Sequence, residues 1–123
     1  MKTVYLAIAG VFGTLARYWL GGFAQRAYGG VFPIGTFAVN MTGCFLFGLV
    51  WTLAEERLVI SGQTRLIILV GFMGAFTTFS SFIFESGALL RDSQFMAAFA
   101  NIALQNVLGV VLLFLGFAVG RLF

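Results

Sequence analysis

Four hydroxyl side chains interrupt one hydrophobic stretch of the chain, Gly71–Phe82, and they are the groups in it most able to do chemistry. Thr77, Thr78, Ser80 and Ser81 share this stretch with two glycines, and neither glycine nor consecutive threonine favours a helix. Where a helix breaks inside a membrane, lipid cannot hydrogen-bond the released carbonyl oxygens, and such oxygens commonly bind cations. The pattern indicates either an ion site at a helix break or an intact helix whose hydroxyl groups bond to preceding carbonyls.

Two phenylalanines of the same stretch could contact an anion. Phe79 and Phe82 are three residues apart, so both rings can line one face of a helix. An aromatic ring has a negative face and a positive edge, so its edge could contact an anion without the full positive charge that would trap it. Packing is the usual role of most of the 16 phenylalanines, and the position beside the hydroxyl groups distinguishes these two.

Three other polar side chains stand within hydrophobic segments and are candidates for a functional role. Arg17 lies in the first segment, Asn40 in the second and Glu85 towards the end of the third. Polar groups at membrane depth are costly and usually face protein or a water-filled path. We favour a functional or site-supporting role for Arg17 and Asn40, and the sequence leaves the role of Glu85 open.

The amide side chains nearer the C-terminus have a more ordinary interpretation. Asn101 and Gln105 are four residues apart and share one helix face with Gly109, whereas Asn106 points elsewhere. Interhelical hydrogen bonding is a usual role of such groups in membranes, and we expect it for Asn106 and for Gln105.

The chain must position all these residues within a bilayer. Of its 123 residues 61% are hydrophobic and 9% are charged, against about 25% charged in a typical soluble domain. A spanning helix needs about 20 mainly apolar residues. We therefore predict an all-α membrane protein, a single transmembrane domain over residues 1–123, with four spans at about 3–23, 34–53, 65–90 and 95–119.

Short loops require the four helices to alternate in direction, which places both termini on one side. The basic residues near that side are Lys2, Arg57, Arg65 and Arg121, against Arg26, Arg91 and, if it leans that way, Arg17 on the other. So weak a bias permits insertion in both orientations, although a single orientation is equally consistent with it. Insertion both ways would allow an antiparallel, dual-topology homodimer that imitates the inverted repeats of larger transporters.

Several classes of site are excluded by the residues that the chain lacks. It has no histidine, so a histidine-ligated metal and a histidine general base are both absent. The single cysteine, Cys44, cannot form an intrachain disulfide. The seven basic residues are scattered singly, so we expect no nucleic-acid partner.

Three motifs, in order along essentially the whole chain, resemble the Fluc family of fluoride channels, also called CrcB proteins. Gly74–Phe82 resembles the family's third-span signature, a glycine-rich start followed by T-T-F-S-T-F. Gly35–Gly43 is similar to its second-span motif G-T-x-x-V-N-x-x-G, and Gly13–Tyr18 to G-x-x-x-R-Y/F in the first span. The two departures, Ala75 for glycine and Ser81 for threonine, replace no side chain that is expected to contact an ion.

The resemblance implies a passive, highly selective fluoride channel that exports cytoplasmic fluoride across the bacterial inner membrane. It implies that the third helix is broken near the midplane. It also implies an antiparallel homodimer with two pores, whose partners are fluoride, a second copy of the chain and the bilayer. No chemical bond is made or broken in such a protein, so we expect no enzymatic activity.

The resemblance also implies roles for individual residues. Those expected along the fluoride pathway are Asn40 as an amide donor, Phe79 and Phe82 through their ring edges, Ser80 through its hydroxyl, Arg17 at the vestibule, and Glu85 and Thr36 on the polar track leading out. A structural sodium ion is expected at the dimer centre, held by the backbone carbonyls of Gly74 and Thr77.

Two other functions are weighed against the channel. A small proton-coupled multidrug exporter of antiparallel four-span type relies on a carboxylate in the first span, where this chain has Arg17 and no acidic residue. A non-transporting assembly subunit gives no reason for Asn40 and the Ser/Thr/Phe segment to lie at membrane depth.

Overall fold

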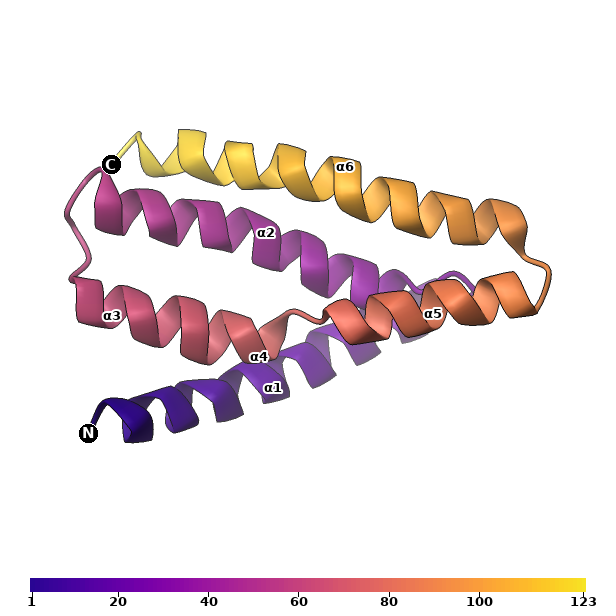
Figure 1. Cartoon of the computed structure of the whole chain (residues 1–123), viewed down its shortest axis with the longest axis horizontal. Helices are drawn as coiled ribbons and strands as arrows, with labels where there is room; N and C mark the ends of the chain where they lie inside the picture. The colour runs from indigo at the N-terminus through magenta and orange to yellow at the C-terminus, as the bar shows by residue number, and fades with distance from the viewer.

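The computed structural model describes residues 1–123 as a bundle of helices without a strand (Figure 1). Its elements are α1 (Lys2–Tyr28), α2 (Ile34–Glu55), α3 (Gly62–Leu66), the π-helical segment η1 (Ile67–Met73), α4 (Gly74–Phe76), α5 (Phe79–Arg91) and α6 (Phe95–Gly120). Elements α3 to α5 together form one span, Gly62–Arg91, so four segments are long and apolar enough to cross a membrane. The predicted all-α fold with four spanning helices is confirmed.

The first turn is fixed by its glycine and by one glutamine. Helix α1 continues past Phe23 to Tyr28 and ends at Gly29, whose φ of 71° lies in the left-handed region that favours glycine. The Gln25 amide donates to the carbonyls of Gly30 and Phe32, both at 3.1 Å. The same side chain accepts from the N–H of Gly35 at 3.0 Å, which ties the turn to the start of α2.

Both termini lie at one end of the bundle, together with the loop between α2 and α3 (Figure 1), as the alternation of four helices predicts. Helices α2 and α6 approach closely because glycines face each other's backbone. A methyl group at Gly48 would overlap the Leu113 carbonyl, and one at Gly116 would overlap the Phe45 carbonyl. This pair forms one wall of the groove described below.

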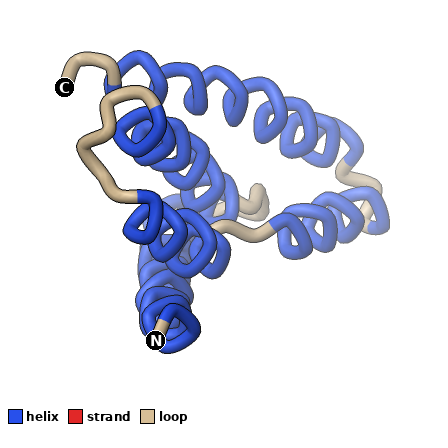
Figure 2. The backbone as a smooth tube through the Cα atoms, turned by 60° about the vertical axis from the view of Figure 1, so that its left-hand side comes forward, coloured by secondary structure: helices blue, strands red, loops and turns tan.

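The third span is broken in its middle, at Thr77 and Thr78. Both residues have extended backbone, with φ and ψ of −84° and 159° and of −148° and 115°, and Figure 2 shows this short non-helical segment between two helical halves. The Thr77 hydroxyl donates to the Met73 carbonyl at 2.9 Å, and the Thr78 hydroxyl accepts from the N–H of Ser81 at 3.2 Å. Each of these side-chain bonds gives a partner to one backbone group beside the break, the Met73 carbonyl and the Ser81 N–H. The alternative of an intact third helix is wrong.

Candidate functional site

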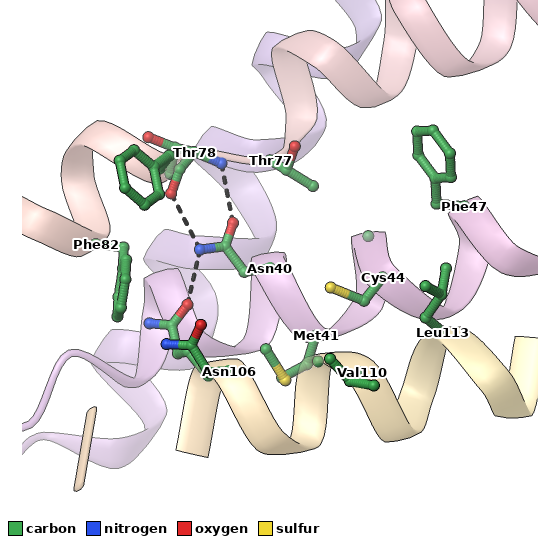
Figure 3. A pocket seen from close by; sticks show the side chains of 14 residues that line it. Asn40, Met41, Cys44, Phe47, Thr77, Thr78, Phe82, Asn106, Val110 and Leu113 are labelled. Carbon is green, nitrogen blue, oxygen red and sulfur yellow. Dashed lines mark hydrogen bonds between the residues drawn. The ribbon is translucent and has the colours of Figure 1, made fainter. Parts of the chain in front are cut away.

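A groove of about 430 Å³ opens where the break in the third span faces α2 and α6 (Figure 3). Its lining includes Asn40, Thr77, Thr78, Phe79, Phe82 and Gln105. The groove therefore brings together Asn40, both phenylalanines and Thr77, four of the residues singled out in the sequence.

The side-chain amide of Asn40 bonds to both backbone polar groups of Thr78, at the break. Its Nδ2 donates to the Thr78 carbonyl at 3.0 Å, and its Oδ1 accepts from the Thr78 N–H at 2.9 Å (Figure 3). The remaining Nδ2 hydrogen is directed to Oε1 of Gln105, at 2.8 Å. A buried polar backbone group requires a partner, so Asn40 both stabilises the break and fixes the direction of its own amide.

The two phenylalanines lie together at the start of α5. Their ring centroids are 6.0 Å apart, with an angle of 52° between the ring planes. Phe82 is 7% exposed and is held by surrounding protein, whereas Phe79 is 74% exposed. One ring is thus fixed within the chain and the other lies at its open surface.

A second cavity lies on the other side of the break, and three further polar candidates, Arg17, Thr36 and Glu85, line it. The Thr36 hydroxyl donates to Oε1 of Glu85 at 2.8 Å, while Oε2 of the same carboxyl is buried without a partner. None of the ion pairs of the chain involves Arg17 or Glu85. Because Thr78 lines both cavities, the break lies between them.

Ser80 and Gly74 line neither of these two cavities, and both are exposed. The hydroxyl oxygen of Ser80 lies 3.5 Å from that of Thr78, which places it beside the break rather than in the groove. The structure therefore does not gather Ser80 with Asn40 and the two phenylalanines.

Among the carbonyls at the break, two lose donors whose new partners are side chains. In a continuous helix each N–H donates to the carbonyl four residues earlier. The N–H of Thr78 donates instead to Asn40, at 2.9 Å, and that of Ser81 donates to the Thr78 hydroxyl, at 3.2 Å. The carbonyls that lose these donors are those of Gly74 and Thr77. Carbonyl oxygens are the available metal ligands here, since no cluster of acidic, cysteine or histidine side chains could hold a metal ion.

Two amide residues of α6 contribute more than the sequence indicated. Asn101 and Gln105 are buried, share one helix face as predicted, and bond to each other at 3.0 Å. Gln105 also reaches Asn40, so its expected interhelical bond is confirmed. For Asn106 that expectation is wrong, since its amide donates to the Ile102 carbonyl of its own helix at 2.7 Å.

Comparison with known proteins places the chain in a family. Residues 4–117 match the sequence profile described as CrcB-like protein, Camphor Resistance (CrcB). A protein of Solidesulfovibrio magneticus named fluoride-specific ion channel FluC is 54% identical over 98% of this chain and 97% of its own length. Proteins of the same name from Nitrosococcus oceani and Geotalea uraniireducens are 53% and 38% identical, with 98% of this chain covered in each case.

These relatives are named as ion channels, in agreement with the expectation that the chain is not an enzyme. With four helices able to span a membrane, the chain is a multi-pass membrane protein. The match extends over nearly its whole length, so the chain belongs to the CrcB-like family, as its three motifs indicated.

Proposed function

We propose that this protein is a passive, highly selective fluoride channel. The observation that carries the proposal is the meeting of Asn40, Phe79 and Phe82 in one groove at the helix break. Relatives at 54% and 53% identity are named as fluoride-specific channels, which supports the same assignment.

The groups in the groove suit a small and strongly hydrated anion. A selective pore must replace the water around the ion with donors at close range, yet let the ion leave. The Asn40 amide and the ring edges of Phe79 and Phe82 are weak donors without net charge. Arg17, unpaired in the neighbouring cavity, supplies a positive charge that attracts anions towards the pathway without lining the groove itself.

A second copy of the chain would complete each pathway. The groove is open, and Phe79 at its edge is 74% exposed, so one chain supplies only part of an enclosing wall. The balanced basic residues permit insertion in both directions, so the two copies would run antiparallel and form two pores.

A sodium ion at the dimer centre fits the carbonyls at the break. Gly74 and Thr77 have carbonyls whose helical donors are redirected to Asn40 and to the Thr78 hydroxyl. Neutral carbonyl oxygens suit an alkali cation, which would compensate the partial negative charge of the broken helix end. Two-fold symmetry would turn one pair of carbonyls into a set of four.

In a bacterium the channel would lie in the inner membrane and release cytoplasmic fluoride down its electrochemical gradient. The test is anion efflux from liposomes that contain the purified protein, followed with fluoride and chloride electrodes in the presence of valinomycin. Rapid fluoride release with little chloride release is expected. Folded protein that releases no fluoride would contradict the proposal, and proton-coupled drug exchange would be measured next.

A further inference from the structure

Behind the groove, buried side chains of α5 and α6 form a chain of hydrogen bonds that ends at Asn40. The Ser86 hydroxyl donates to the Phe82 carbonyl at 2.8 Å and accepts from Nδ2 of Asn101 at 2.9 Å. Oδ1 of Asn101 accepts from Nε2 of Gln105 at 3.0 Å, and Oε1 of Gln105 accepts from Asn40 at 2.8 Å. Asn101 is fully buried and Gln105 is 8% exposed, so these bonds are shielded from solvent.

At the Asn40 end of this series of hydrogen bonds, donor and acceptor are fixed. The N–H of Thr78 holds Oδ1 of Asn40, and the Thr78 carbonyl accepts one Nδ2 hydrogen. The second Nδ2 hydrogen therefore points to Gln105, and no amide hydrogen of Asn40 is left over. An anion that is to accept from Asn40 must replace the Gln105 oxygen.

The other end can reverse if the Ser86 hydroxyl gives up its bond to the Phe82 carbonyl. A serine hydroxyl either donates or accepts, and half a rotation of a primary amide exchanges its donor and acceptor. If both amides turn, Nδ2 of Asn101 donates to Oε1 of Gln105, and the Ser86 hydroxyl donates to Oδ1 of Asn101. The side chains of Ser86, Asn101 and Gln105 stay bonded to one another, while the Phe82 carbonyl loses the Ser86 hydroxyl. At Asn40 two N–H groups then face each other.

We propose that Gln105 supplies a second amide N–H to the anion pathway through this reversal. An anion in the groove is held between the amide hydrogens of Asn40 and Gln105, with Asn101 and Ser86 acting as positioning residues behind them. Without an anion the two facing N–H groups lack an acceptor, so the observed direction is restored when the ion leaves. This inference rests on the proposed function, because its anion is the fluoride of that pathway.

The first test is single-channel conductance in planar bilayers, measured as a function of fluoride activity. Gln105→Met keeps the length of the side chain and removes the amide, and it is expected to raise the half-saturating fluoride activity about tenfold, because a buried donor is lost. Ser86→Ala, which removes the group that must exchange donor and acceptor roles, is expected to raise it about fivefold. Ser86→Thr keeps the hydroxyl and should restore the wild-type value.

A double-mutant cycle separates this role from general packing. If Ser86 acts through Gln105, Ser86→Ala causes no further change in protein that already carries Gln105→Met. A purely structural contribution of Ser86 would instead add to the effect of Gln105→Met.

A second measurement needs neither substitution nor conduction. In folded protein labelled with ¹⁵N at glutamine side chains, the amide proton resonance of Gln105 is expected to move downfield with fluoride and not with chloride. Gln63 and Gln94, both exposed, are internal controls whose resonances should stay in place. This resonance decides the matter if Gln105→Met fails to fold.

The outcomes are distinguishable. A wild-type fluoride channel with an unchanged half-saturating activity in Gln105→Met, additive effects of Ser86→Ala, or an unmoved Gln105 resonance overturns the role of Gln105 alone. Folded wild-type protein without fluoride conductance overturns the proposed function and this inference with it.

Discussion

Charged side chains are paired differently at two places in the bundle, the end that carries the termini and the centre. At the terminal end the Glu56 carboxylate accepts from two guanidinium nitrogens of Arg121, at 2.8 and 3.1 Å. In the centre Arg17 has no ion pair, and Glu85 has one hydrogen bond, from Thr36, and one buried oxygen without a partner. Charges that are fully paired hold helix ends together, whereas unpaired groups beside a cavity stay available to an ion.

The largest effect is expected where the groove would contact its ion, at the two phenylalanines. Phe79→Ile and Phe82→Ile keep an apolar side chain and remove the positively polarised ring edge, so fluoride efflux from liposomes should fall about tenfold in each. Gel filtration and circular dichroism identify the folded variants. Wild-type efflux from both folded variants would show that the rings serve packing only.

The break itself is tested at Thr77, by separating its side chain from its carbonyl. Thr77→Ala removes the hydroxyl that bonds to the Met73 carbonyl and keeps the Thr77 carbonyl, so the sodium content of protein purified into choline buffer should be unchanged. Thr77→Pro removes an N–H that donates to Met73 at 3.0 Å and disfavours the helical backbone of Phe76, so sodium should be lost. Folded Thr77→Ala without sodium would contradict ligation by carbonyls.

A smaller effect is expected where α2 supports the break. A methyl group at Gly43 would overlap the Thr77 side chain, so Gly43→Ala should lower the free energy of unfolding by about 1–3 kcal/mol through overpacking. Gly87→Ala is the matched control, because a methyl group there meets no atom within 4 Å and alanine favours a helix. Thermal unfolding in detergent measures both, and equal midpoints would show that close approach at Gly43 does not support the break.

The four spans could be predicted, and a possible break could be indicated, because part of their cause is local in the sequence. A membrane demands long apolar segments, and these are visible as runs without charge. Hydroxyl groups contribute to the break through backbone atoms three or four residues away, as Thr77 does at Met73 and Thr78 at Ser81. Local competition of this kind can be read from residue types and spacing. The bonds of the Asn40 amide to Thr78, which also stabilise the break, come from another helix and could not be read from spacing.

The partners of the amide side chains could not be predicted in the same way. Periodicity gives the face of a helix but not the helix that this face meets. The bond from Asn40 to Gln105 depends on α2 lying against α6. The expectation for Asn106 is wrong because its amide reaches a carbonyl of its own helix, that of Ile102. Ser80 illustrates the same limit, since its motif places it beside Phe79 but not on the groove.

The smallest effect is expected at the terminal end, where paired charges are exposed. Hydrogen bonds from Arg121 lower the pKa of Glu56 below its usual value. A carboxyl group with a lowered pKa stabilises the folded state above its unfolded pKa, of about 4.3, and this contribution is lost as pH falls through the folded pKa. In Glu56→Gln the thermal midpoint should therefore fall less steeply as pH drops below about 4.3. The difference should be small, because solvent and salt screen an exposed pair. Fluoride efflux should be the same in both proteins, because the pair lies outside both cavities. If the thermal midpoint of Glu56→Gln has the same dependence on pH as that of the wild type, the pair contributes nothing to holding the helix ends together.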